Sequence, residues 1–177
     1  MKAKELLKRY RKRELDCCEA ILHGTNLQKA NLSRINLKRA DLSHSNLNQA
    51  DLSGACLKQA NLTNAELKQA CLVGADLAEV NLIGADLAST DLSGANLSGA
   101  DLRCANLQGA NLSHTNLTDV DLGGADLTGA DLSNAQLAGT DLSVADTTGA
   151  IVSSISLDKG ERTHSDGSHH WVSWSGD

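Results

Sequence analysis

Leucine recurs at every fifth position along most of this chain. The run begins at Leu22 and ends at Leu142, and all twenty-five of its positions hold leucine. Two residues before the leucine, alanine occupies nineteen of the 27 positions from Ala20 to Ala150. The residue between them is Asn or Asp at 21 of the 25 positions from 26 to 146. The repeated unit is therefore Ala-(Asp/Asn)-Leu followed by two variable residues.

A period of five fits neither regular secondary structure. On an α-helix, five residues turn the side-chain direction by about 500°, so successive leucines would spread around the helix. On a β-strand, side chains alternate between faces, so every second leucine would point to water. All the leucines can be buried together only if each unit turns a corner. The pattern predicts a cornered solenoid whose structural core includes Leu42, Leu62, Leu82, Leu102, Leu122, Ala100 and Ala110.

The unit stays in phase from residue 15 to about residue 159, and different segments flank it. Residues 2–13 predict a short helix, because Leu6, Leu7 and Tyr10 have near-helical spacing. We expect these three side chains to cap the first coil. The helix also carries seven basic residues, which indicate either a solvated cap face or a patch for nucleic acid or a membrane surface.

The C-terminal flank is polar and rich in Gly and Ser, which is typical of a flexible tail. We expect Trp171 and Trp174 to cap the last coil. The predicted organisation is a capping helix over 1–14, repeats over 15–159 and a tail over 160–177.

Composition narrows the possible core and compartment. Phe and Pro are absent and aromatic residues make up 2% of the chain, so the core must be built from Leu and Ala. The five cysteines lack the spacing of a disulfide framework. The charged N-terminus has no apolar stretch behind it, and no window is apolar enough to span a membrane. These features predict a cytoplasmic protein without a transmembrane segment.

The Ala-(Asp/Asn)-Leu unit resembles the pentapeptide-repeat family, which is abundant in cyanobacteria. The N-terminal run ELLKRYRKRELDCCEAILHGTNLQKANL also resembles the openings of cyanobacterial members. The resemblance implies an all-β solenoid, a right-handed quadrilateral β-helix with four units per coil. The repeats would then form about seven coils, with leucines twenty residues apart stacked on one another.

Charge is distributed unevenly along the chain. Residues 1–70 hold 13 Lys and Arg against 7 Asp and Glu, whereas residues 71–177 hold 3 against 15. With four units per coil, three aspartates fall on each of two neighbouring sides. They form a candidate acidic interaction surface of Asp101, Asp121, Asp141, Asp86, Asp126 and Asp146.

No catalytic motif, phosphate-binding loop or convincing metal-ligand set is present, so we expect neither an enzyme nor a bound cofactor or metal. The favoured function is a non-catalytic interaction scaffold for an unidentified protein partner, without direct nucleic-acid binding. The basic start and acidic remainder also allow end-to-end self-association. The alternative is a DNA mimic that modulates DNA gyrase, because some family members bind type II topoisomerases. Charge spread around all four sides argues against the mimic.

Overall fold

A tight turn ends each five-residue unit and sets the architecture. We describe residues 1–154 of a computed structural model. In most units, an amide donates to the leucine carbonyl three residues earlier, as Ala55 does to Leu52 at 3.0 Å. The residue before that amide has positive φ, and Gly54 has a φ of 62°. A positive φ at the third of four turn residues is the feature of a type II β-turn. The backbone therefore bends at every unit.

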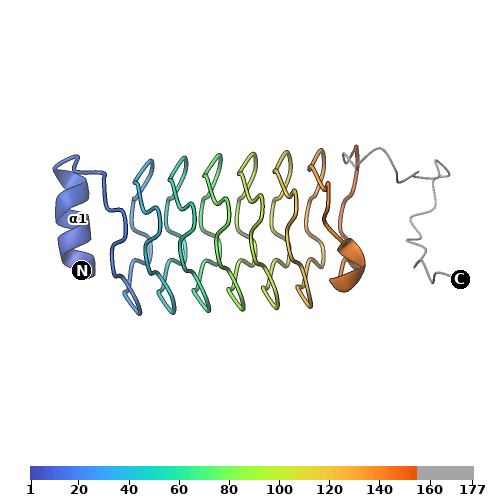
Figure 1. Cartoon of the computed structure of the whole chain (residues 1–177), viewed down its shortest axis with the longest axis horizontal. Helices are drawn as coiled ribbons and strands as arrows, with labels where there is room; N and C mark the ends of the chain where they lie inside the picture. The colour runs from blue at the N-terminus through green and yellow to red at the C-terminus, as the bar shows by residue number, and fades with distance from the viewer. Residues whose placement is uncertain (155–177) are drawn as a thin grey trace, which may run out of the picture.

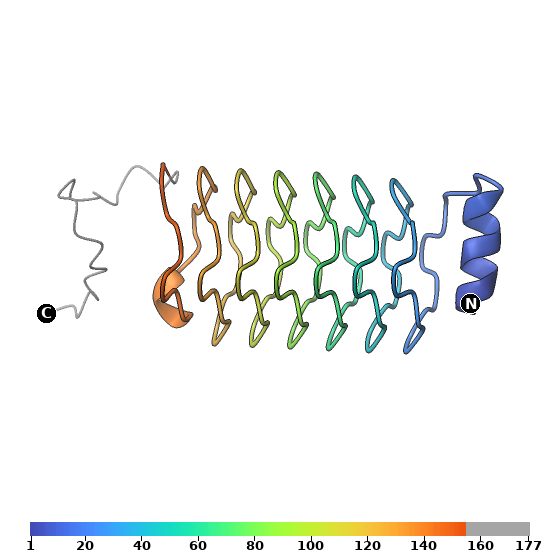
Figure 2. The ribbon, with the colours of Figure 1, turned by 180° about the vertical axis from the view of Figure 1, so that it is seen from behind.

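Four units complete one coil. Parallel β-bridges join each Asp or Asn position to the residue twenty positions later, as in Asp41 with Asn61. Leu42 donates its N–H to the Asn61 carbonyl at 2.8 Å, and Asn61 donates to the Ala40 carbonyl at 2.9 Å. Figure 1 and the reverse view in Figure 2 show the resulting rod, with the N-terminus at one end.

The β-bridges between coils are isolated. Within residues 1–154 they do not extend into strands, because only a short stretch lies between successive turns. The expected solenoid is confirmed, whereas its right-handed sense and its seven coils stay predictions.

The corner residues explain where the regular coil ends. Every fifth residue from Glu19 to Ser154 has a positive φ, except Val144. A β-branched side chain strongly disfavours that conformation. The corner forms the 3₁₀-helix η1, Leu142–Val144, instead. The structure has no bridge between Asp121 and Asp141, although their neighbours on the other sides remain paired.

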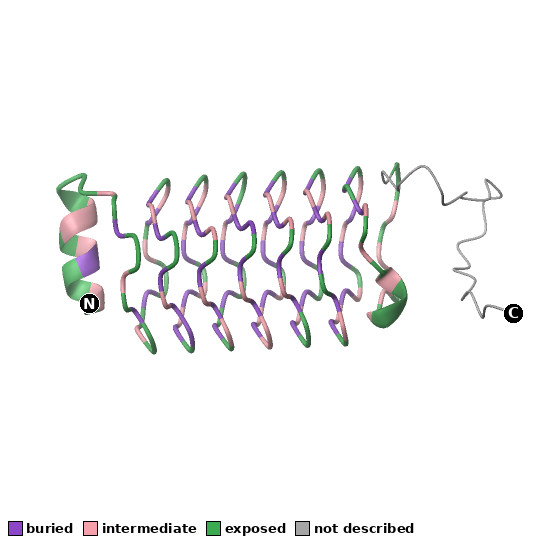
Figure 3. Cartoon of the chain, viewed as in Figure 1, coloured by how far each residue is buried: buried purple, intermediate pink, exposed green. Residues whose placement is uncertain are grey.

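Leucine and alanine fill the interior of the rod. Leu42, Leu62, Leu82, Leu102 and Leu122 are at most 1% exposed, and they lie twenty residues apart on one side. Ala100 and Ala110 are each 1% exposed at inner corners. Figure 3 shows this alternation of buried and exposed positions on the coils that precede η1. Because each buried Leu contributes roughly 1.5–3 kcal/mol, the stacked column is the main apolar contribution to stability.

Helix α1, Ala3–Arg11, lies across the first coil at the N-terminal end (Figure 1). Leu6 is fully buried, and Leu7 and Tyr10 pack against the core with partial exposure. The Tyr10 hydroxyl donates to Asn31 Oδ1 at 2.8 Å. The same hydroxyl lies 3.0 Å from Ser33 Oγ. These contacts attach the helix to the repeats through both apolar and polar groups.

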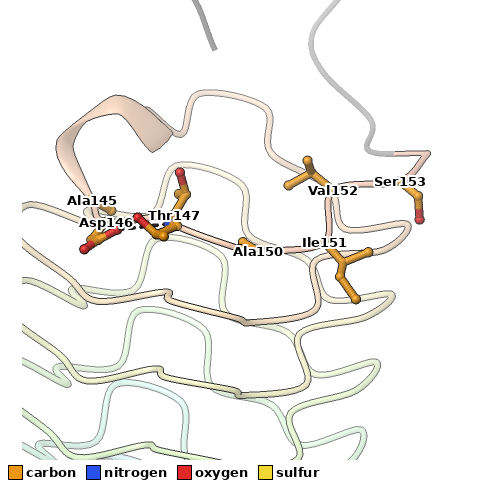
Figure 4. Close-up of a pocket in the computed structure, with 9 residues that line it drawn as sticks. Ala145, Asp146, Thr147, Ala150, Ile151, Val152 and Ser153 are labelled. Carbon is orange, nitrogen blue, oxygen red and sulfur yellow. Dashed lines mark hydrogen bonds between the residues drawn. The ribbon is translucent and has the colours of Figure 1, made fainter. Parts of the chain in front are cut away.

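The opposite end of the described rod is more open. Val144 is 46% exposed and Ile151 is 54% exposed. Figure 4 shows Ile151 and Val152 beside a shallow hollow lined by residues 145–153. Trp171 and Trp174 lie outside the described residues. No helix within residues 1–154 is long and apolar enough to cross a membrane.

Candidate interaction surface

The Asp or Asn of each unit stabilises the turn that follows it. Oδ1 of Asp121 accepts the N–H of Gly123 at 3.0 Å. Oδ1 of Asn111 accepts the N–H of Ser113 at 3.1 Å in the same way. Asp and Asn side chains commonly bond to their own backbone two residues on. Either residue can therefore hold the turn, and the choice between them changes only the charge and the donor capacity.

The donor capacity matters between coils. Where Asn follows Asp in a stack, its Nδ2 donates to the carboxylate below. Asn96 donates to Asp76 at 3.2 Å, and Asn111 donates to Asp91 at 3.1 Å. An Asp stacked on another Asp lacks this donor and places two negative charges on adjacent coils. Asp-on-Asp stacks therefore join adjacent coils less favourably than Asn-on-Asp stacks do.

The acidic surface consists of the six aspartates assigned above to two neighbouring sides. On the first side, a β-bridge joins Asp101 to Asp121, and Asp141 follows after the interrupted corner. On the second side, a β-bridge joins Asp126 to Asp146. Asp86 lies in that second column, separated from Asp126 by Asn106. The two columns lie on neighbouring sides because, within one coil, the two positions are only five residues apart.

Two cations neutralise the part of this surface nearer the N-terminus. Lys68 Nζ lies 3.0 Å from Asp86 Oδ2. Arg103 Nη2 lies 2.7 Å from Asp101 Oδ2, and its Nε lies 3.6 Å from Asp121 Oδ2. Beyond Arg103, residues 104–154 contain six Asp and no Lys, Arg or Glu. The uncompensated charge therefore lies toward the C-terminal end of the described rod.

Hydrogen bonds keep these carboxylates ionised. The Thr128 hydroxyl and backbone N–H, with the Gln108 amide, lower the pKa of Asp126. The Ser143 hydroxyl and backbone N–H lower the pKa of Asp141. For Asp146 the Thr148 hydroxyl and N–H also lower the pKa, although the negative charge of Asp126 opposes them. Hydrogen bonds to the charged form favour it, so this region is anionic at neutral pH.

The Asp101 carboxylate has a different main partner. The Arg103 guanidinium donates to it and lowers its pKa, with a further contribution from the Arg103 backbone N–H. The same ion pair raises the pKa of Arg103. Because Arg103 is half exposed, this pair sets local charge more than it contributes to stability.

Cysteines and possible metal ligands are the other reactive side chains in the described part of the chain. All five cysteines are free thiols, and Cys17 is the one that is buried. Residues 1–154 hold no group of three or more His, Cys, Asp or Glu side chains that could bind a metal. The hollow in Figure 4 lies at the end of the rod, and Asp146 of the acidic surface is one of the residues that line it.

Sequence reasoning missed one polar cluster near the N-terminal end. His23 and His44 lie on adjacent coils, with ring centroids 5.3 Å apart. Ser43 and Asp41 lie beside them in one hydrogen-bonded chain. The available signal was the spacing of 21 residues, one coil plus one residue, which only becomes meaningful once the coil length is known.

Comparison with known proteins identifies the repeat. The family model described as pentapeptide repeats matches in eight copies, over residues 20–59, 57–78, 81–119 and 105–143. None of the curated proteins compared matches the chain.

Solved structures of similar repeats were also found. QnrB1, a plasmid-mediated fluoroquinolone resistance protein, is 18% identical with a TM-score of 0.52, over 81% of this chain and 82% of that one. HetL, involved in heterocyst differentiation regulation in the cyanobacterium Nostoc, is 28% identical with a TM-score of 0.29, over 88% and 94%. A pentapeptide repeat protein of the Arabidopsis thaliana thylakoid lumen is 28% identical with a TM-score of 0.42, over 72% and 81%. The QnrB1 match supports the solenoid fold alone.

Proposed function

Because the chain belongs to the pentapeptide-repeat family, we propose that it is a non-catalytic scaffold that binds a protein partner through its acidic surface. The platform in this proposal is a right-handed rod of about seven coils over 15–159, between a capping helix over 1–14 and a tail over 160–177. The stacked Leu and Ala residues keep the platform rigid, and the outer positions make the contacts. The location in this proposal is the cytoplasm.

One observation carries the proposal. Residues 104–154 hold six Asp and no Lys, Arg or Glu, and Asp121 and Asp141 are exposed on one side of the rod. A surface with one sign of charge favours partners with complementary charge and speeds their association. The partner's binding face is therefore expected to be basic.

Affinity capture with charge variants tests this function. The test variant replaces the four aspartates of the acidic surface that lie nearest its C-terminal end with Asn: Asp121, Asp126, Asp141 and Asp146. Asn keeps the turn hydrogen bond, so the fold is retained while the charge is removed. The matched control makes the same change on the other two sides, at Asp51, Asp76, Asp91 and Asp131. A partner that is captured by native protein and control but not by the test variant supports the proposal. Identical capture by all three rejects it.

The second candidate is a DNA-mimicking modulator of DNA gyrase, and the density of negative charge is the observation that favours it. Duplex DNA carries one charge per about 1.7 Å of axis. The charge here is distributed differently, because Asp119 and Asp131 face the two sides outside the acidic surface. A supercoiling assay separates the candidates: neither inhibition nor protection of gyrase at micromolar protein rejects the mimic.

End-to-end self-association is a further candidate within the scaffold function. The exposed side chains of Lys4, Lys8 and Arg11 give α1 a basic outer side, whereas the last described coil carries Asp141 and Asp146. Opposite charge at the two ends favours head-to-tail contact. Sedimentation at low salt should reveal assemblies that dissociate at about 1 M salt, where the Debye length is about 3 Å. A monomer at both salt concentrations eliminates this candidate.

A further inference from the structure

Two imidazoles lie next to each other on one edge of the rod. His23 belongs to the first coil and His44 to the second. Their ring centroids are 5.3 Å apart, with an angle of 70° between the ring planes. Both side chains are exposed. Such proximity is informative because imidazole is a preferred ligand for Zn²⁺, Cu²⁺ and Ni²⁺.

A hydrogen-bonded chain fixes the first ring. The Ser43 hydroxyl donates to Asp41 Oδ1 at 2.6 Å and lies 2.8 Å from His23 Nδ1. Since the serine proton points to the carboxylate, its oxygen must accept the proton of Nδ1–H. Neutral His23 therefore carries its free lone pair on Nε2. Metal-binding histidines are typically oriented in this way, by donating their other N–H to an oxygen acceptor.

Asp41 is itself held firmly. Its Oδ1 accepts the Ser43 N–H at 3.1 Å and the Asn61 amide at 3.4 Å. The Ser43 hydroxyl is the main cause that lowers the pKa of Asp41, and the two nearby histidines contribute through their charge. Ser43 is 7% exposed, so the link between the carboxylate and His23 is sheltered from water. The arrangement therefore supplies a fixed negative charge behind the first ring.

Space beside the second ring is open. His44 occupies the corner position of the second coil that matches Gly24 of the first coil, twenty residues earlier. A Cβ added at Gly24 would meet no atom within 4 Å. The exposed His44 ring can therefore rotate toward the corner without displacing a side chain.

We propose that His23 and His44 form a surface site for a divalent transition-metal cation such as Zn²⁺, with Ser43 and Asp41 as positioning residues. Zn–N bonds of about 2.0–2.1 Å and tetrahedral angles place the centroids of two bound imidazoles about 5 Å apart. The observed 5.3 Å agrees with that spacing. Water completes the coordination, so the ion is exchangeable and open to a further ligand from outside.

Zn²⁺ titration of the full chain by calorimetry, under reducing conditions, tests the site. The variants H23N and H44N each remove one imidazole. Asn at 23 retains an N–H donor for Ser43, and Asn at 44 suits the positive φ of 55°. The matched control is H114N, because His114 also occupies an exposed corner with positive φ, 59°. The histidines at 164, 169 and 170 remain in every variant and give the same background.

The native chain and H114N should bind one Zn²⁺ more than H23N or H44N at neutral pH. S43A should weaken the site by about tenfold, because it removes the orienting hydrogen bond but neither ligand. Unchanged melting temperatures of H23N and H44N would confirm that the variants fold.

Two results would overturn the proposal. One is that the H23N and H44N isotherms coincide with the native isotherm. The other comes from the tautomer of neutral His23, read from its ring ¹⁵N chemical shifts. The structure requires the proton on Nδ1, so a proton on Nε2 contradicts the orientation on which the site depends.

Discussion

Replacing Val144 with Gly should extend the regular coil into the last corner. In the regular coils, each Leu N–H and the facing Asp or Asn N–H donate across the coil boundary, as Leu102 does to Asp121 at 2.8 Å. Between Leu122 and Asp141 these two bonds are missing from the described structure. η1 occupies that corner, because Val144 cannot easily adopt the positive φ found at the equivalent Gly124, 67°.

The gain can be estimated from those two bonds. Each backbone hydrogen bond contributes about 1 kcal/mol net, so restoring both gives about 2 kcal/mol. The greater backbone entropy of Gly in the unfolded chain removes about 0.5–1 kcal/mol. The V144G variant should therefore resist local opening by about 1 kcal/mol more than the native chain. This corresponds to roughly fivefold slower exchange of the amides involved.

Hydrogen exchange read by NMR is the appropriate assay, because the effect is local to one end of the rod. The amides of Leu122 and Asp141 should gain protection in V144G, and those of the central coils should not change. G124V is the converse control: its Cβ has space, with the nearest contact at 3.7 Å, but its φ is positive. It should lose about 1–2 kcal/mol. Unchanged exchange at Leu122 and Asp141 in a folded V144G chain would refute the reasoning.

Three further changes have defined outcomes. A100L should lower the thermal midpoint more than L142A, because Ala100 is 1% exposed whereas Leu142 is only partly buried at the end; overpacking costs about 1–3 kcal/mol or more, and the reverse order would contradict the packing argument. Y10F should destabilise the chain by about 1 kcal/mol in a thermal melt, because its hydroxyl bonds to Asn31 and Ser33 are lost, and an unchanged midpoint would contradict this. The lowered pKa values of Asp101, Asp126, Asp141 and Asp146 predict a contribution to stability that is present above the ordinary value of 3.8 and is lost as pH falls below it. Thermal melts at acid pH that compare the native chain with D101N, D126N, D141N and D146N would measure this contribution.

The sequence predicted the interior because its evidence was geometrical. A leucine at every fifth position excludes both regular elements, so burial of Leu42 or Leu102 required corners. The period alone did not predict how the coils are joined, because hydrogen bonding between coils depends on the coil length. That length came only from the family resemblance. The all-β solenoid was implied by the family resemblance, and in the described residues its coils are joined by isolated β-bridges rather than by strands. The contacts of Arg103 with both Asp101 and Asp121 could be predicted only once the coil length was known.

Two local features escaped prediction for different reasons. The irregular corner at Val144 had a signal, because a β-branched residue occupies a position that elsewhere needs a positive φ. The need for a positive φ comes from the type of turn, and the pattern of hydrophobic residues does not reveal the turn type. The His23 and His44 pair had no local signal, because contact across a coil boundary joins residues 21 positions apart.

The choice between Asp and Asn separates the needs of folding from those of the surface. Both residues hold the turn, but only Asn donates to the coil below, as Asn106 does to Asp86 at 3.2 Å. Folding alone would therefore favour Asn wherever the neighbour is Asp. At Asp146 the chain has instead a second carboxylate over Asp126, with no Lys or Arg in residues 104–154 to compensate it. Since the interior does not require this charge and the stacking disfavours it, the carboxylate supports the proposal that the acidic surface binds a basic partner.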